Sequence, residues 1–296
     1  MIGKLLIAAA LAAALGPAAL GQTRFTATVS GPTEKAMVGQ SDDVILIPGL
    51  ASSGAVWDET VKQLAPSHRV HVLQIRGFAG EPAGANADGS ILAPLVEEVA
   101  AYAAKLKHPA IIGHSLGGLV ALEVAAKAPD AVSRIMVVDA APFYGLLVGG
   151  PNATSAGIKA MTAPMREQVM SLDDATFAQA QDQQMRSLVK SDAKRAAPLN
   201  WSIQSDRAVV VEAMLEDLAE DARPLLPLIT AKTTVLYAWD ASAMAQGMPA
   251  AKADALFISL YAPLKGVKLK RIDNTFHFIM LDQPQVFADE VAAFLK

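Results

Sequence analysis

The chain has 296 residues, which is enough for one large α/β domain or for a core domain with an inserted segment. Hydrophobic residues make up 52% of the chain and charged residues 18%, which allows a sizeable buried core. The formal net charge of −4 and the lack of a basic stripe give no reason to expect a nucleic-acid partner. Because the sequence contains no cysteine, an exported product has to be stable without disulfides.

Residues 1–21 have the pattern of a cleavable secretory signal peptide. Lys4 is the only charged residue, Leu5–Leu15 is a short apolar core, and small residues at Ala19 and Gly21 predict cleavage before Gln22. An uncleaved membrane anchor is the rival interpretation, but Gly16-Pro17 interrupts an apolar run that is already short for a span. We therefore expect a periplasmic or secreted protein with no stable membrane anchor after cleavage, and a lipidated anchor is excluded because cysteine is absent.

Downstream of this leader, short apolar segments alternate with helical ones. Strand character is found in Arg24–Ser30, Asp43–Ile47, Val70–Ile75, Ala110–Ile112, Arg134–Val138, Thr233–Trp239 and Val267–Ile272. Helical character is found in Val56–Leu64, Ile91–Leu106, Leu116–Lys127, Ala250–Tyr261 and from Pro284 to the C-terminus. The first strand alternates apolar and polar residues and is expected at a sheet edge. The alternation of strands and helices predicts an α/β fold with a mostly parallel central sheet and helices on both faces.

This alternation stops at Ala141-Pro142, and no strand pattern returns before about Thr230. The residues between them are rich in Met and Gln, with helical character in Thr162–Ser171, Asp174–Val189 and Arg207–Leu218. We therefore expect residues 142–228 to form a helical lid inserted into a core of residues 22–141 and 229–296. Flexible methionines in the lid could line an adaptable pocket, although such residues more often form a lid's own core. They are Met161, Met165, Met170, Met185 and Met214.

A Gly-x-Ser-x-Gly pattern follows Ala110–Ile112 and leads directly into a helical segment. This order fits a sharp strand-to-helix turn with Ser115 exposed at its tip as a candidate nucleophile. Such a turn crowds the backbone on both sides of the serine, and Gly113 and Gly117 supply the positions without a Cβ. An ordinary glycine-rich β–α turn is the alternative, but the flanking strand and helix favour the nucleophile.

A serine hydroxyl needs a base at neutral pH, and the base is usually histidine. In a turn of this type the histidine follows the serine in the chain, and only His277 does so. It lies in the loop after the last expected strand, at the sheet end where Ser115 is expected; a structural histidine is the alternative. The other four are weaker candidates, and no metal site or cofactor is expected from them: His68, His71, His108 and His114.

The imidazole needs a carboxylate that holds its tautomer and stabilises its charged form. Asp139 and Asp240 each end a buried strand downstream of Ser115. We favour Asp240 as the acid, because Asp139 can instead cap the following turn through its side chain. Asp273 is near His277 in sequence, but loop polarity is enough to explain it.

The oxyanion of an acyl-transfer intermediate needs more than one hydrogen-bond donor. Leu116 begins the helix after the serine, so its N–H is one expected donor. Pro48-Gly49-Leu50 follows an early core strand, which places the N–H of Leu50 opposite that of Leu116. Gly49 lets the backbone approach closely.

Together these residues resemble the α/β-hydrolase superfamily, as a serine esterase-like or lipase-like member with a helical cap. The similarity runs from about Asp43 to the C-terminus and is carried by the Gly-x-Ser-x-Gly turn, the Pro-Gly-Leu loop and the order Ser115, Asp240, His277. The sequence departs from the family pattern at Pro48, where histidine is common, and in the loop that begins at Ile75-Arg76-Gly77.

The resemblance implies a serine hydrolase that cleaves small-molecule carboxylic esters with small to medium hydrophobic groups through an acyl-enzyme, and the leader predicts that it is exported. A lactonase or a carbon–carbon bond hydrolase with the same triad is the alternative among enzymes. A binding protein that has lost turnover is the alternative outside enzymes. Fold alone does not select a substrate, so these functions stay open at this point.

Overall fold

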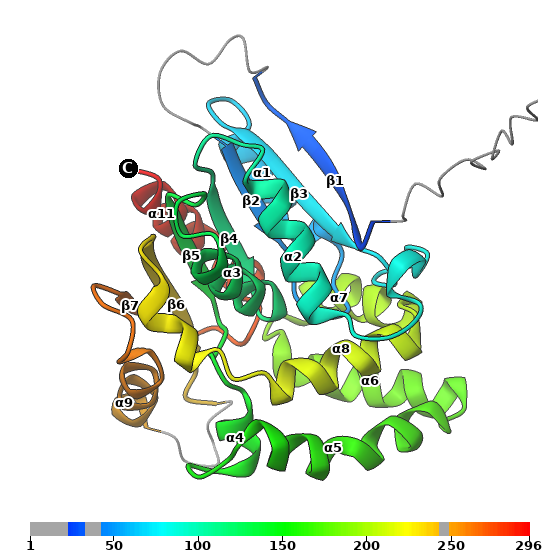
Figure 1. Cartoon of the computed structure of the whole chain (residues 1–296). Coiled ribbons are helices and arrows are strands. Elements are labelled where there is room, and N and C mark those ends of the chain that lie inside the picture. Colours follow the sequence, from blue (N-terminus) through cyan, green and yellow to red (C-terminus); the bar gives the residue numbers. More distant parts are fainter. Residues whose placement is uncertain (1–22, 33–42, 243–248) are drawn as a thin grey trace, which may run out of the picture.

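A seven-stranded sheet forms the centre of the molecule (Figure 1). The computed structural model describes residues 23–32, 43–242 and 249–296, so the expected signal peptide lies outside the described residues. The strand order is β1-β3-β2-β4-β5-β6-β7. The strands are β1 (Phe25–Ser30), β2 (Asp43–Ile47), β3 (Arg69–Ile75), β4 (Ala110–His114), β5 (Arg134–Val138), β6 (Lys232–Trp239) and β7 (Lys268–Asp273).

The sheet is parallel except for β1, which pairs antiparallel with β3 at one edge. The predicted edge strand and mostly parallel sheet are both confirmed. All residues of β2 and of β4 are buried, because these strands lie inside the sheet and are covered on both faces. Because β2 and β4 run parallel, their carboxyl ends lie at the same end of the sheet, where the next loops begin.

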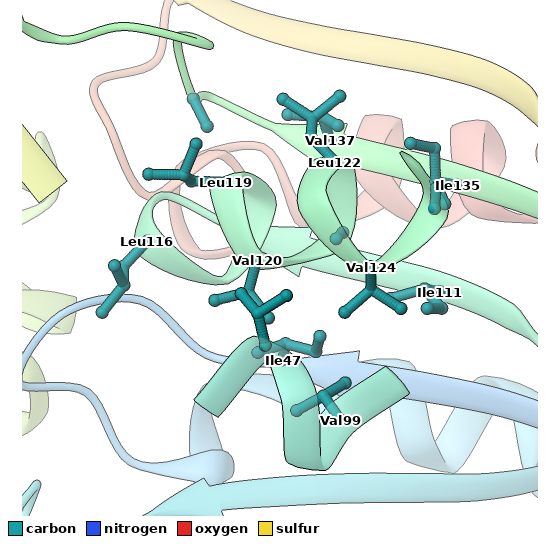
Figure 2. Packing of buried hydrophobic residues seen from close by; sticks show 14 of the residues in the cluster. Ile47, Val99, Ile111, Leu116, Leu119, Val120, Leu122, Val124, Ile135 and Val137 are labelled. Carbon is teal, nitrogen blue, oxygen red and sulfur yellow. The ribbon is translucent and has the colours of Figure 1, made fainter. Parts of the chain in front are cut away.

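Two apolar layers cover the two faces of the sheet. One contains α2 (Leu92–Ala103), α3 (Leu116–Lys127) and α9 (Ala250–Tyr261). The other contains α1 (Asp58–Leu64), α10 (Ile279–Asp282) and α11 (Pro284–Phe294). Figure 2 shows the first layer, where Val120 and Val124 of α3 point towards Ile47 of β2 and Ile111 of β4. This packing fixes where α3 begins and therefore where the turn before it lies.

The segment between β5 and β6 is helical, as the loss of strand pattern predicted. It contains α4 (Gly145–Gly149), α5 (Ser155–Met170), α6 (Asp174–Leu188), α7 (Asp192–Gln204), α8 (Arg207–Ala219) and a 3₁₀ turn (Arg223–Leu228). The sequence did not predict α4 or α7, because α4 is very short and Pro198 interrupts the pattern of α7. No helix within the described ranges is long and apolar enough to cross a bilayer.

Side-chain caps explain where two of these helices start. Asp173 accepts a hydrogen bond from the N–H of Thr176 at the start of α6 (2.8 Å). Asp206 accepts from Ala208 and Val209 at the start of α8 (3.0 and 3.1 Å). These contacts satisfy N–H groups that the first helical turn leaves without a partner. They fix the register of α8, which determines the residues that it presents to the sheet.

Candidate active site

Ser115 stands at the turn between β4 and α3 with a φ of 53° and a ψ of −123°, a strained conformation for a residue with a side chain. Its N–H donates to the carbonyl of Val138 on β5 (2.9 Å). Its own carbonyl accepts from the N–H groups of Gly118 (2.7 Å) and Leu119 (3.1 Å). The sharp strand-to-helix turn inferred from the sequence is present, and both the neighbouring strand and the helix hold it in place.

Two glycines allow this turn to pack against the rest of the sheet. A Cβ on Gly113 would lie 2.0 Å from the carbonyl oxygen of Gly117, so the strand and the helix could not approach as they do. A Cβ on Gly117 would lie 2.3 Å from the carbonyl oxygen of Ile47, at the end of β2. Both positions are therefore closed to residues with a side chain, and the loop after β2 is held directly against the turn.

Most of the other described non-glycine residues with a positive φ lie at the same end of the sheet; His108, which precedes β4, is the exception. Ala51 after β2, Asp139 after β5 and Asn274 after β7 have φ values of 53°, 49° and 60°. Positive φ values are uncommon in residues other than glycine and tend to cluster at functional sites. Ligands of open α/β sheets bind beyond the carboxyl ends of the strands, so the strained backbone identifies the functional end of this sheet.

His277 lies in the loop between β7 and α10, and its Nδ1 is 2.7 Å from Oδ2 of Asp139. The second carboxylate oxygen of Asp139 accepts a hydrogen bond from the N–H of Ala238 on β6 (2.8 Å). An ionised carboxylate can only accept, so Nδ1 carries the proton and Nε2 of His277 is left as a base. The imidazole is therefore oriented as a proton acceptor needs to be.

The sequence favoured Asp240 as the carboxylate beside His277, and this prediction was wrong: the structure places Asp139 there. Asp240 is buried and forms an ion pair with Nζ of Lys190, in the loop between α6 and α7. It also accepts a hydrogen bond from the N–H of Ser242 (2.7 Å). Asp240 thus connects the core to the helical segment, while Asp139, which had been assigned to a turn cap, contacts the imidazole.

Strand order and register explain this outcome. β5 lies directly beside β4, whereas β6 is one strand further from Ser115. Val138 pairs with Leu236, so Asp139 is level with the next residue of β6. Asp240 lies three residues further along, past the end of that strand. The aspartate nearer to the serine is therefore the one that meets His277.

His114 packs beside the catalytic candidates without joining them. Its ring centroid is 4.6 Å from that of His277, and its Nε2 donates to the carbonyl oxygen of His277 (3.1 Å). Its Nδ1 is buried and has no partner among the described residues. Burial, together with the nearby His277, lowers the pKa of His114 well below its usual value, so the ring is neutral. His114 therefore supports the loop that carries His277.

The backbone N–H groups of Leu50 and Leu116 are the two expected oxyanion donors, and both residues lie beside Ser115. Within the described part of the chain, neither Leu50 N–H nor Leu116 N–H donates a hydrogen bond. Leu116 is the first residue of α3, where N–H groups have no partner inside the helix. Gly49 brings the loop of Leu50 close to the turn, since a Cβ there would lie 3.0 Å from Cβ of Ser115.

Tyr144 is a site residue that the sequence did not reveal. Its phenol donates to the carbonyl oxygen of Asp139 (3.0 Å), and its side chain lines the same cavity as Ser115. Burial and the nearby Asp217 raise the pKa of Tyr144 well above its usual value, so the phenol stays protonated. Only its position five residues after a strand-ending aspartate could have indicated it, and that signal is weak.

A cavity of about 560 Å³ lies over Ser115 and His277. Leu50 and Tyr144 also line it, and helices α5, α6, α7 and α8 supply most of the remaining walls. Of the five methionines noted in the sequence, Met165, Met185 and Met214 line this cavity, whereas Met161 and Met170 do not and are exposed. The helical segment therefore forms the wall of the site facing the serine.

A second cavity of about 310 Å³ lies on the other side of the same residues, and its lining includes Asp139, Tyr144 and His277. The remaining lining is mostly apolar and comes from α9 and the ends of β6 and β7, including Phe257 and Leu260. Among the described residues, no group of three His, Cys, Asp or Glu side chains is arranged to hold a metal ion.

Residues 43–284 match the family model described as the alpha/beta hydrolase fold. The chain belongs to the α/β-hydrolase family. The matched region of this α/β-hydrolase includes every strand except β1 and contains Ser115, Asp139 and His277. The family resemblance seen in the sequence and the fold class predicted from it are thereby confirmed.

The α/β-hydrolase is similar to two curated proteins named pimeloyl-[acyl-carrier protein] methyl ester esterase. It is 30% identical over 197 residues to that of Aeromonas hydrophila, covering 63% of this chain and 74% of the relative. It is 33% identical over 129 residues to that of Aliivibrio salmonicida, covering 44% of this chain and 48% of the relative. The chain thus spans about half the length of the second relative.

Solved structures with the same fold include an enol-lactonase from Burkholderia xenovorans, with a TM-score of 0.70, 17% identity and coverage of 92% of this chain and 96% of that one. A thermophilic esterase from Thermogutta terrifontis has a TM-score of 0.70, 18% identity and coverage of 92% of both chains. At such low identity these similarities show the fold alone.

The roles of the two aspartates can be separated by amide substitution. Asp139→Asn should lower ester turnover by about 10⁴, because the amide can donate to Nδ1 and hold the wrong tautomer of His277. Asp240→Asn should cost less than about tenfold in turnover, since it weakens the ion pair to Lys190 at the wall of the smaller cavity and leaves the contact between Asp139 and His277 intact. Turnover of one short ester and circular dichroism should be measured for both variants. A dead Asp240 variant beside an active Asp139 variant would refute this assignment.

The neutral His114 predicts a pH-dependent stability. Because the pKa of His114 is lowered in the folded state, the unfolded chain binds more protons below pH 6.5, and stability falls with falling pH. Protonation of His114 in the unfolded chain should lower the free energy of unfolding by about 2 kcal/mol between pH 6.5 and pH 5. His114→Gln should therefore be less stable than the parent at pH 8, with the difference shrinking by about that amount at pH 5. Urea denaturation at both pH values measures it; a constant difference would show that the pKa of His114 is the same in the folded and unfolded states.

Proposed function

We propose that this protein is a serine hydrolase that cleaves carboxylic esters with small to medium hydrophobic groups. One observation carries the proposal: Ser115, the Asp139-oriented His277 and the Leu50 loop line one cavity. A nucleophile, an oriented base and free N–H donors are the parts that acyl transfer requires. The names of the two esterases similar in sequence support the same class of reaction.

The proposed reaction runs through a covalent acyl-enzyme. The Ser115 oxygen attacks the ester carbonyl while Nε2 of His277 takes its proton, and the Leu50 and Leu116 N–H groups stabilise the oxyanion. The intermediate then releases the alcohol, which takes the proton back from His277. Water attacks the acyl-enzyme by the same route, releasing the carboxylic acid and restoring Ser115. The Asp139 carboxylate stabilises the imidazolium during both halves, and no step uses a cofactor.

Tyr144 fits this scheme as a residue that positions Asp139. Its phenol donates to the carbonyl oxygen of Asp139 (3.0 Å). A protonated phenol at this position holds the backbone that carries the carboxylate beside His277. It lies between the two cavities, so we assign the larger cavity to the acyl group and the smaller one to the alcohol.

Residues 142–228 are proposed to act as a lid over the acyl group, since their helices line most of the larger cavity. Export is a separate proposal that depends on residues 1–21 alone: we propose a periplasmic or secreted mature protein beginning at Gln22. N-terminal sequencing of the protein recovered outside the cytoplasm tests it, and an intact Met1 would refute cleavage.

The nucleophile is tested with a fluorophosphonate probe and a panel of p-nitrophenyl esters. The parent should be labelled and should hydrolyse the panel. Ser115→Ala should lose both properties because the nucleophile is gone, and should remain folded because it removes only a hydroxyl from the buried Ser115 side chain and leaves its Cβ in place. Labelling is followed by intact mass and folding by circular dichroism. Retained turnover in the Ser115 variant would place the reaction elsewhere.

The lid is tested by narrowing the acyl cavity from one helix. Met165 of α5 lines the cavity, whereas Met161, one turn earlier on the same helix, is 50% exposed and does not. Met165→Trp should lower kcat/KM for the octanoate ester by about tenfold or more relative to the acetate ester, because the larger ring fills the space of the chain. Met161→Trp is the matched control and should leave this ratio within about twofold. If the ratio of kcat/KM for the octanoate ester to that for the acetate ester is the same in both variants, the cavity does not hold the acyl chain.

A further inference from the structure

Asp217 lies on α8 in the wall of the larger cavity, which Ser115 and His277 also line. Its exposed fraction is only 8%. Its Oδ1 is out of reach of solvent and has no hydrogen-bond partner in the described part of the chain, so a ligand in the cavity would meet the carboxyl group through its other oxygen, Oδ2. A carboxyl group in this situation loses its hydration without gaining a partner from the protein, which is costly.

Other buried aspartates in the described residues differ from Asp217 in this respect. Asp43 is paired with Arg69 and also contacts His71 (3.0 Å). Asp240 is paired with Lys190. Each of these carboxylates receives donors from its own chain, as buried charges normally do. Asp217 therefore stands out as an acid in the wall of a substrate cavity that lacks a donor from the protein.

The surroundings of Asp217 define the group that would fit beside it. Glu123 of α3 and Glu220, the residue after α8, are close to Asp217. Burial, together with the charges of Glu220 and Asp217, raises the pKa of Glu123 to about 8. Tyr144 and His277 face Asp217 from the core, and burial raises the pKa of Asp217 itself to about 7. Lys127 lies beyond, beside Glu123. This acidic neighbourhood disfavours a carboxylate or phosphate on the substrate.

A carboxyl group keeps at least one accepting oxygen in either protonation state. The partner that satisfies it at every pH is therefore a neutral hydrogen-bond donor. The rest of the cavity wall near Asp217 is apolar and includes Val210, Met214 and Leu218. A chain that is largely hydrocarbon with one donor group matches such a wall.

We propose that Asp217 is a specificity residue that binds a hydroxyl group on the acyl chain, so that the enzyme prefers esters of hydroxylated fatty acids. This proposal rests on the proposed function, because it places the acyl chain in the larger cavity. A site with a buried acceptor discriminates strongly against a ligand that leaves the acceptor without a donor. A plain acyl ester therefore leaves the Asp217 carboxyl without a donor when it binds, which weakens its binding. A hydroxylated acyl ester supplies the donor and avoids this loss.

Turnover of matched p-nitrophenyl esters tests the preference. The assays are run at pH 8 with hexanoate and octanoate esters. Each chain is either plain or carries a hydroxyl or a methoxy group, at carbon 3 or at the chain end. The parent should prefer one hydroxy ester over its plain analogue by about tenfold or more in kcat/KM, and the methoxy ester, which has no donor, should gain nothing. No preference for any hydroxy ester, or an equal gain for methoxy, would overturn the proposal.

Three variants assign the preference to the Asp217 side chain. Asp217→Asn keeps an accepting oxygen and should retain most of the preference, whereas Asp217→Leu, which cannot accept, should lose it. Glu220→Gln is the matched control: it removes a nearby negative charge from a residue outside the described cavity lining, and should keep the ratio. Circular dichroism confirms folding of each variant. A preference that survives in Asp217→Leu, or that disappears in Glu220→Gln, would show that the carboxyl does not bind the hydroxyl.

Binding without turnover separates this proposal from the proposed function. In a Ser115→Ala background, methyl 6-hydroxyhexanoate should raise the melting temperature more than methyl hexanoate does, and the additional Asp217→Leu change should abolish the difference. If the parent hydrolyses plain esters but neither assay shows a preference, Asp217 is misassigned and the esterase proposal stands. If the parent hydrolyses no ester but the binding difference appears, the esterase proposal fails and the Asp217 site stands.

Discussion

The close contact between the β4–α3 turn and the loop after β2 is the constraint on which the rest of the site depends. Gly117 lies against the carbonyl oxygens of Ile47 and Pro48, closer than any side chain would permit. This contact brings the loop that carries Leu50 next to Ser115 and the start of α3. The strained backbone of the serine is maintained because strand β5 and helix α3 both hold it through hydrogen bonds. Backbone packing therefore determines the positions of Ser115 and of the Leu50 loop, independently of the catalytic side chains.

Around this turn the sheet supplies the other polar groups by strand order. Asp139 and His277 come from loops far apart in the chain, after β5 and after β7, and meet because both strands end at the same edge. His114 supports the loop of His277 through its carbonyl, and Tyr144 supports the loop of Asp139 in the same way. Each catalytic candidate is thus held by a neighbour that hydrogen-bonds to its backbone, which leaves its side chain available for substrate.

The helical segment between β5 and β6 is connected to the core by polar contacts as well as by packing. The buried Asp240 pairs with Lys190, and Asp282 of α10 accepts from the N–H groups of Lys190 and Ser191. These contacts place α6 and α7 over the serine, while α8 brings Asp217 into the cavity wall. An acid kept without a partner costs stability, and such a cost is typical of functional positions rather than of structural ones.

The sequence by itself determined the alternation of strands and helices, the position of the nucleophile turn and the histidine. These features depend on local patterns: apolar runs bounded by turns, glycines at fixed spacing around Ser115, and a histidine after the last strand. Asp217 could also have been noticed in the sequence. It follows Val209 and Ala213 at intervals of four residues, so it places an acid on the buried, apolar face of α8. The choice between Asp139 and Asp240 was decided only by the tertiary structure. Both end a buried strand, and only strand order and register determine which of them reaches the imidazole.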